Sequence, residues 1–200
     1  MLTIPEPVWD TLVAAFEAAP PGHERVAYLD GIRFRDRDGI AHGVATTVTV
    51  PDAVTTPFNF RVSPGAMAQA GEHFTPLGLV RLAQVHTHGN ACTRHSPTDD
   101  QRAYSQRDGA LSLVLPHHAS GRPRPEQAGV HVREPAGWRR VRPEEASRLI
   151  RLVPGLIDRR SNPWNASPTG TKAISADGLS PSPKPGTWLS RWWPRRAQRT

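Results

Sequence analysis

The chain has 200 residues and a mass of 22.0 kDa, which is room for one ordinary domain or for one domain and a tail. Its only cysteine, Cys92, excludes an intrachain disulfide framework and a cysteine-rich zinc module. No apolar run approaches the roughly 18 residues that span a bilayer, and the N-terminus lacks a signal-peptide pattern. We therefore expect a soluble, cytoplasmic protein.

The formal net charge of +7 is concentrated near the C-terminus. Residues 154–200 hold eight basic and two acidic residues, whereas residues 1–153 are nearly balanced. The C-terminal part also has seven prolines and little apolar periodicity, so it has little burial to offset the entropy cost of ordering. We predict a folded domain over 1–153 and a largely disordered tail over 154–200.

The tail ends in a cluster of tryptophan and arginine, residues 187–196. Such a cluster suits an acidic partner or an anionic membrane surface, and a solvated basic terminus with no fixed role is the ordinary alternative. Because the body of the chain is nearly neutral, a body-wide nucleic-acid interface is not expected.

The predicted elements of the body alternate between helices and strands. Apolar residues at three- and four-residue steps predict a helix over 6–19, which Pro20, Pro21 and Gly22 end. Further along the chain we predict strands over 26–29, 32–34 and 44–50, a helix over 64–74, a strand over 79–85, a helix over 96–106, a strand over 111–115, a hairpin from 129–133 and 138–142, and a last helix over 143–153. Helices before, inside and after a run of strands indicate a mixed α/β or α+β fold.

The stretch that carries chemistry is His86-Thr87-His88, followed after seven residues by Ser96 and, two residues later, by Asp99. Side chains two apart on a strand point to the same face, so both imidazoles can meet one metal ion. Asp99 can supply a third, oxygen ligand. Two histidines and one carboxylate, with a position open to water, are typical of a catalytic zinc site, although such a donor set also suits Fe²⁺ or Mn²⁺.

Each part of this pattern also has a purely structural explanation. Ser96 and Asp99 match a helix-starting capping box, with Pro97 at the first helical position. A His-x-His pair at a strand end can also be two surface histidines that bind no metal. The two uses are compatible, because Ser96 can begin a helix while its hydroxyl faces the site.

Taken together, His86-Thr87-His88, Ser96 and Asp99 resemble the H-S/T-H-x7-S-x2-D signature of the JAMM (MPN-plus) zinc metalloproteases. That family also has a glutamate after a first helix and at the start of a strand, and Glu24 stands there, with Glu72 as the second choice. The resemblance implies an MPN/cytidine-deaminase-like mixed sheet flanked by helices.

The chain departs from the family pattern at three places. Gly89 replaces the proline that usually follows the second histidine, and this predicts a looser loop. Asp30 stands where the family usually has an apolar residue before a glycine. The long gap between Glu24 and His86 indicates an insertion around 51–63, which we interpret as a substrate-facing loop.

The resemblance implies a role for each matching residue. His86, His88 and Asp99 would hold Zn²⁺, Glu24 would act as general base and then general acid, and Ser96 would donate a hydrogen bond to the oxyanion. The implied reaction is hydrolysis of an amide or isopeptide bond after the C-terminal glycine of a ubiquitin-like or sulfur-carrier protein, as in bacterial deubiquitinase-like relatives. Proteins resembling E1 and E2 enzymes are the expected partners.

The alternative is a catalytically idle MPN-like scaffold that docks on a partner or membrane through its tail. For the remaining polar residues near the motif the sequence favours ordinary roles. Asp100 is balanced between an acceptor for a metal-bound imidazole and a helix-start charge. The other expectations are a plain loop residue at Cys92, loop surface at His95, a turn at His117 and His118, and hairpin packing at Trp138.

Overall fold

The computed structural model describes residues 1–155, so the predicted tail lies, except for its first two residues, outside the described residues. Within them, eight strands form one sheet in the order β10-β1-β3-β2-β6-β7-β8-β9, and two more form a separate hairpin, β4-β5. The strands are Leu2–Pro5 (β1), Val26–Arg35 (β2), Ala41–Thr49 (β3), Ala53–Thr56 (β4), Asn59–Val62 (β5), Val80–Thr87 (β6), Leu111–Leu115 (β7), Gly129–Glu134 (β8), Gly137–Arg140 (β9) and Ile150–Val153 (β10). The helices are Glu6–Glu17 (α1), Pro64–Phe74 (α2), Pro97–Arg102 (α3) and Pro143–Leu149 (α4).

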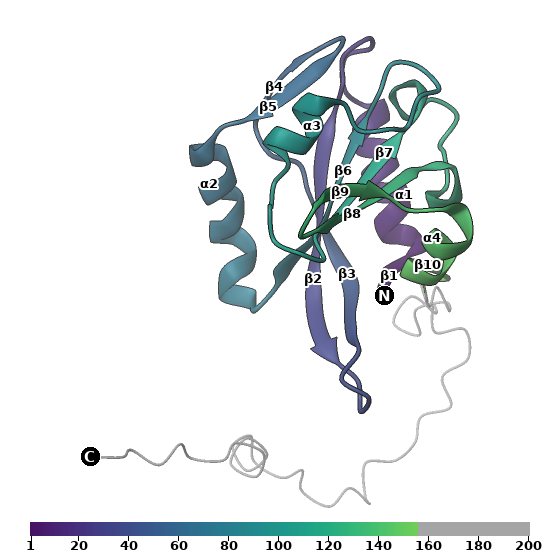
Figure 1. Cartoon of the computed structure of the whole chain (residues 1–200). Coiled ribbons are helices and arrows are strands. Elements are labelled where there is room, and N and C mark those ends of the chain that lie inside the picture. The colour runs from purple at the N-terminus through teal and green to yellow at the C-terminus, as the bar shows by residue number, and fades with distance from the viewer. Residues whose placement is uncertain (156–200) are drawn as a thin grey trace, which may run out of the picture. The chain divides into compact units, whose positions relative to one another are not determined.

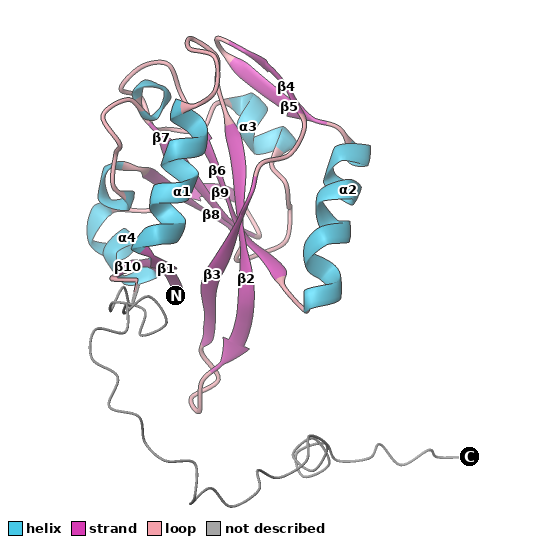
Figure 2. Ribbon diagram, turned by 180° about the vertical axis from the view of Figure 1, so that it is seen from behind, coloured by secondary structure: helices cyan, strands magenta, loops and turns pink. Residues whose placement is uncertain are grey.

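The sheet is mixed, which confirms the expected fold class. Strand β1 is parallel to both β3 and β10, and β6 is parallel to β7, whereas β2 runs antiparallel to β3 and β6. Helix α1 covers one face, and α2, α3 and the β4-β5 hairpin lie on the other side (Figures 1 and 2). No helix of the described part has the length and apolar character that crossing a membrane requires.

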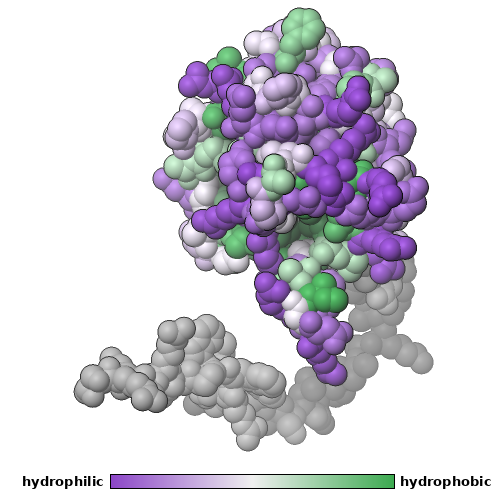
Figure 3. Space-filling model, viewed as in Figure 1, coloured by the Kyte–Doolittle hydropathy of each residue, from purple (hydrophilic) through white to green (hydrophobic). Residues whose placement is uncertain are grey.

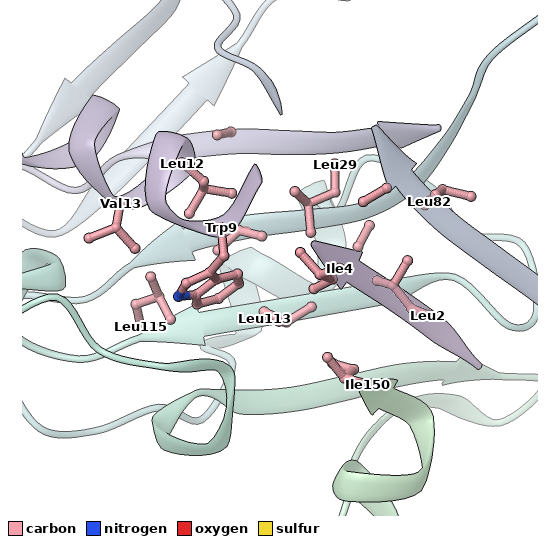
Figure 4. Close-up of a cluster of buried hydrophobic side chains, with 14 of the residues drawn as sticks. Leu2, Ile4, Trp9, Leu12, Val13, Leu29, Leu82, Leu113, Leu115 and Ile150 are labelled. Carbon is pink, nitrogen blue, oxygen red and sulfur yellow. The ribbon is translucent and has the colours of Figure 1, made fainter. Parts of the chain in front are cut away.

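The two faces of the sheet differ in chemistry because side chains alternate along each strand. Apolar side chains from one face pack against Trp9, Leu12 and Val13 of α1 and form the main core (Figure 4). The opposite face carries buried polar side chains instead, at Gln84, His86, Ser112 and His131, beside a small apolar cluster around Tyr28 and Phe60. The polar face is therefore the one available for chemistry. The outer surface over it is mostly hydrophilic (Figure 3).

The strand predictions around Asp30 and Gly31 merge into one long strand with a bulge. The register of β2 shifts at these residues against both neighbours. A side chain at Gly31 would collide with the carbonyl oxygen of Val44, so only glycine fits. Asp30 is fully buried and pairs with Arg81, whose Nε lies 3.1 Å from Oδ1. This pair explains how an acidic residue is accommodated where an apolar one was expected.

Two helix predictions are wrong in their extent. The last helix ends at Leu149, and Ile150–Val153 forms β10, which pairs with β1 in parallel. Helix α3 ends at Arg102 because Ala103 adopts an extended conformation and the next amide, that of Tyr104, donates to Oε1 of Gln84 at 3.3 Å. In both cases a partner distant in sequence outweighs local helix propensity. The expected insertion at 51–63 contains the β4-β5 hairpin.

Candidate metal centre

The two histidines lie at the C-terminal end of β6, an interior strand between β2 and β7. His86 is fully buried and lies next to Val26 of β2, and His88 follows directly after the strand end. The amide of Thr87 donates to the carbonyl of Arg25, and the amide of His88 donates to that of Leu115. Both neighbours of β6 thus hold this segment, and its period-2 geometry places both imidazoles on the polar side.

The third residue reaches the histidines through the start of α3. Ser96 is the N-cap: its Oγ accepts from the amide of Asp99 at 3.2 Å, and its amide donates to Oδ2 of Asp99 at 2.7 Å. This is a capping box with aspartate in the position usually taken by glutamate or glutamine. The box orients the Asp99 carboxylate, which is itself buried.

His86, His88 and Asp99 converge, with one donor atom from each lying within 4.8 Å of the others. Nε2 of His86 is 3.6 Å from Oδ1 of Asp99, and Nε2 of His88 is 3.4 Å from Oδ2. Nε2 of His86 is buried without a hydrogen-bond partner. Because a buried, unpartnered nitrogen is costly and two imidazoles with a carboxylate are typical zinc ligands, these residues fit a divalent metal ion.

Neighbouring groups engage the other ring nitrogen of each histidine. Nδ1 of His88 donates to the backbone carbonyl oxygen of Cys92 at 2.9 Å. Nδ1 of His86 lies 3.4 Å from the side-chain nitrogen Nε2 of Gln84. Such partners fix ring orientation at metal sites and leave the ε nitrogens facing the third ligand. Gln84 was missed in the sequence, although its position two residues before His86 on the same strand is a signal.

The charges of the three residues are strongly coupled. Burial raises the pKa of Asp99, but the interactions with His86 and His88 outweigh burial and hold this pKa well below its usual value. Burial lowers the pKa of His86. For His88 burial also acts downward, yet the contact with Asp99 raises the net pKa above 6.5. Asp99 is therefore ionised and His86 neutral, which are the states that metal ligation needs, whereas the raised pKa of His88 favours a proton that a metal ion would displace.

Glu24 lies two residues before the start of β2 and lines the same pocket as His88. Its amide donates to the carbonyl of Thr56 at 2.8 Å, so β4 holds this residue in place. Burial raises the pKa of Glu24 to about 7, His88 opposes the rise, and Asp99 adds to it. A carboxylate with a pKa near neutrality is suited to accepting and returning a proton. The second choice, Glu72, is exposed on α2.

The pocket that His88 and Glu24 line has a volume of about 340 Å³. Its walls come from three segments that are distant in sequence, namely Glu24, the hairpin turn with Pro57 and Phe58, and the loop after β6. His118 completes the wall. The predicted turn at His117 and His118 is present, but the sequence did not indicate that it faces the site.

The remaining expectations have mixed outcomes. His95 was expected on the loop surface, and this is wrong, because its side chain is only 4% exposed. Asp100 contacts His95 rather than a ligand histidine. Trp138, on the β8-β9 hairpin, meets the ring of His95 edge-on. Cys92 is exposed, and its carbonyl oxygen, not its thiol, contacts His88.

Comparison with solved structures finds several that are similar to this chain, one of them with a TM-score above 0.5. A protein of Desulfitobacterium hafniense, solved in solution, aligns over 78% of this chain and 95% of its own with 19% identity and a TM-score of 0.57. A JAB1/MPN domain protein of Archaeoglobus fulgidus aligns over 76% and 98% with 16% identity and a TM-score of 0.40. A protein of Salinibacter ruber aligns over 76% and 91% with 17% identity and a TM-score of 0.45. No protein-family model and no curated protein matches the sequence.

Proposed function

We propose that this chain is a zinc metallopeptidase that hydrolyses an amide or isopeptide bond after the C-terminal glycine of a ubiquitin-like or sulfur-carrier protein. The observation that carries the proposal is the convergence of His86, His88 and Asp99, one of which, His88, lines a pocket together with Glu24. These residues also match the zinc-metalloprotease signature.

His86, His88 and Asp99 would hold the metal. Zn²⁺ bound there would supply Lewis acidity and lower the pKa of a water ligand to about 7. The chain's own part in proton transfer belongs to Glu24, which takes a proton from the attacking water and returns it to the leaving amine. Its pKa of about 7 suits both steps near neutral pH.

Ser96 would stabilise the developing oxyanion. Its Oγ uses a lone pair to accept from the Asp99 amide, so the hydroxyl proton is available for a second hydrogen bond. Removing one oxyanion donor typically costs about 2.7–4 kcal/mol of transition-state stabilisation.

The β4-β5 hairpin is where we propose that an extended substrate tail binds. It forms a two-stranded sheet of its own, and its turn residue Phe58 is 89% exposed beside the pocket. An extended tail can add to such an edge by backbone hydrogen bonds, and terminal glycines let the backbone approach a metal closely. Proteins resembling E1 and E2 enzymes are proposed partners in the same modification system, and an acidic partner or anionic membrane is the proposed target of the basic tail.

The test is hydrolysis of a ubiquitin-like fusion by the full chain, with and without a chelator. We expect Glu24→Gln to keep bound zinc but lose activity by about 10²-fold or more. The matched control is Glu72→Gln, the same substitution at the exposed α2 position, which should leave both unchanged. Activity that survives both chelation and Glu24→Gln would contradict the proposal.

A further inference from the structure

A polar cluster, buried except for the side chain of Asp100, lies beside the metal centre and includes none of its ligands. Its centre is His95, whose ring stacks on His131 with a centroid distance of 3.8 Å and lies 5.7 Å from the ring of His86. Nδ1 of His95 lies 2.8 Å from Oδ1 of Asp100, and Nε2 lies 2.9 Å from Oγ of Ser112. The backbone amide of His95 donates to Nε2 of His131 at 3.3 Å.

One neutral tautomer of His95 satisfies both side-chain contacts. Nδ1–H donates to the carboxylate of Asp100, and Nε2 accepts from the hydroxyl of Ser112. The order of the three groups is that of a serine-hydrolase triad. However, Ser112 is fully buried as the second residue of β7, so no substrate can reach its hydroxyl. The chain of hydrogen bonds therefore offers no accessible nucleophile.

The segment that His95 holds is the one that carries Asp99. Helix α3 has six residues, which is too short to be stable without tertiary contacts. The capping box orders its first turn internally but does not fix that turn against the sheet. His95 provides that link, since it precedes the N-cap, bonds to Ser112 on β7 and bonds to Asp100 directly after Asp99.

We propose that His95 is a positioning residue of the metal centre, which through Ser112 and Asp100 sets where the Asp99 carboxylate meets the ion. The inference rests on the metal-binding part of the proposed function and not on peptidase activity. Loss of a group that orients a metal ligand typically lowers metal affinity by about 10–100-fold.

The test uses the full chain loaded with Co²⁺, whose visible absorption reports ligand geometry. His95→Phe keeps the ring and its packing but removes both hydrogen bonds. We expect at least about a tenfold loss of Co²⁺ affinity in chelator competition, together with a changed absorption spectrum. His73→Phe on α2, the same substitution at an exposed histidine, should change neither.

Two further variants separate positioning from general stability. Adding Ser112→Ala to His95→Phe removes the hydroxyl that would otherwise be buried without a partner, so the thermal midpoint of the metal-free chain should recover. We expect the Co²⁺ affinity and the absorption spectrum of this double variant to remain different from those of the wild type. If both return to wild type in this double variant, His95 is merely structural and the proposal is overturned.

Ser112→Ala alone is a small change that keeps the fold, and we expect a weaker loss of affinity with the same direction of spectral change. A wild-type spectrum and affinity in this variant would also overturn the proposal. A wild-type chain that binds no Co²⁺ would overturn it too. A chain that binds Co²⁺ but cleaves no fusion would refute the peptidase alone, and the results of the variants would still decide the role of His95.

Discussion

Gly89 lies directly against the imidazole of His118: a Cβ built at residue 89 would fall 2.8 Å from Nε2 of His118. The two segments are also joined by their backbones, since the amide of His118 donates to the carbonyl of His88 at 2.7 Å. His117, His118 and Ala119 have positive φ values between 52° and 63°, a conformation that costs free energy in residues other than glycine. Gly89 thus makes room for His118 at the pocket that Glu24 and His88 line, whereas the sequence had suggested only a looser loop.

Gly89→Ala should therefore destabilise the protein by about 1–3 kcal/mol, because the added methyl group overpacks the contact with His118. In a His118→Ala background the same change should be neutral, or stabilising by about 0.4–1 kcal/mol through the lower entropy of the unfolded chain. A double-mutant cycle by urea unfolding measures the coupling. Equal effects in both backgrounds would show that the two residues do not compete for space.

The buried pair of Asp30 and Arg81 gives a second prediction. Arg81→Ala leaves a fully buried carboxylate with only the hydroxyl of Thr49 as a side-chain partner, so we expect a loss of about 3–5 kcal/mol in unfolding free energy. Asp30→Leu combined with Arg81→Met removes both charges and should recover most of this loss. Urea unfolding of the single and double variants checks both values. A double variant no more stable than Arg81→Ala would contradict the charge-burial explanation.

The stability of the metal-free protein should fall in acid. Burial lowers the pKa of His86, His95 and His131 below 6.5, and that of His131 reaches about 3. Below pH 6.5 the unfolded chain binds protons at these positions that the native protein does not, so unfolding free energy decreases as pH falls, by up to about 1.4 kcal/mol per pH unit for each such proton. Glu24 acts in the opposite direction between pH 7 and 4.5 because its pKa is raised.

Urea midpoints of the metal-free chain between pH 7.5 and 4.5 measure this dependence. His131→Gln keeps an acceptor for the His95 amide but removes one titrating group, and its midpoint should decline less steeply than that of the wild type. Parallel declines in the two proteins would show that His131 does not contribute.

Metal affinity should also depend on pH. Near pH 7 the metal-free site is partly protonated at Glu24, with a pKa of about 7, and the contact with Asp99 raises the pKa of His88 despite burial. Because a metal must displace any proton on His88 and is favoured by an ionised Glu24, metal affinity should rise with pH until both groups are deprotonated and then level off. The slope should be about tenfold per pH unit for each proton displaced.

Calorimetric titration with Zn²⁺ in buffers of different ionisation enthalpy counts the released protons. Glu24→Gln should show a shallower pH dependence, whereas Glu72→Gln should follow the wild type. An affinity that is constant from pH 6 to 8 would argue against protonated site residues.

Local patterns in the sequence were enough to predict much of the candidate site. The alternation of a strand places His86 and His88 on one face whatever else the chain does, and the spacing of Ser96 and Asp99 predicts a capping box because both depend on contacts within a few residues. The same holds for the core-facing stripe of α1 and for helix α2, whose bounds match the prediction.

Features that depend on contacts between residues far apart in the chain could be seen only in the tertiary structure. Ile150–Val153 becomes a strand because β1 offers a parallel partner, and His95 is buried because His131 and Ser112 surround it. Glu24 reaches the pocket because β2 lies beside β6, and His118 lines it because Gly89 leaves space. Sequence periodicity encodes the direction of a side chain on its own element, whereas the neighbours it meets are set by the packing of several elements at once.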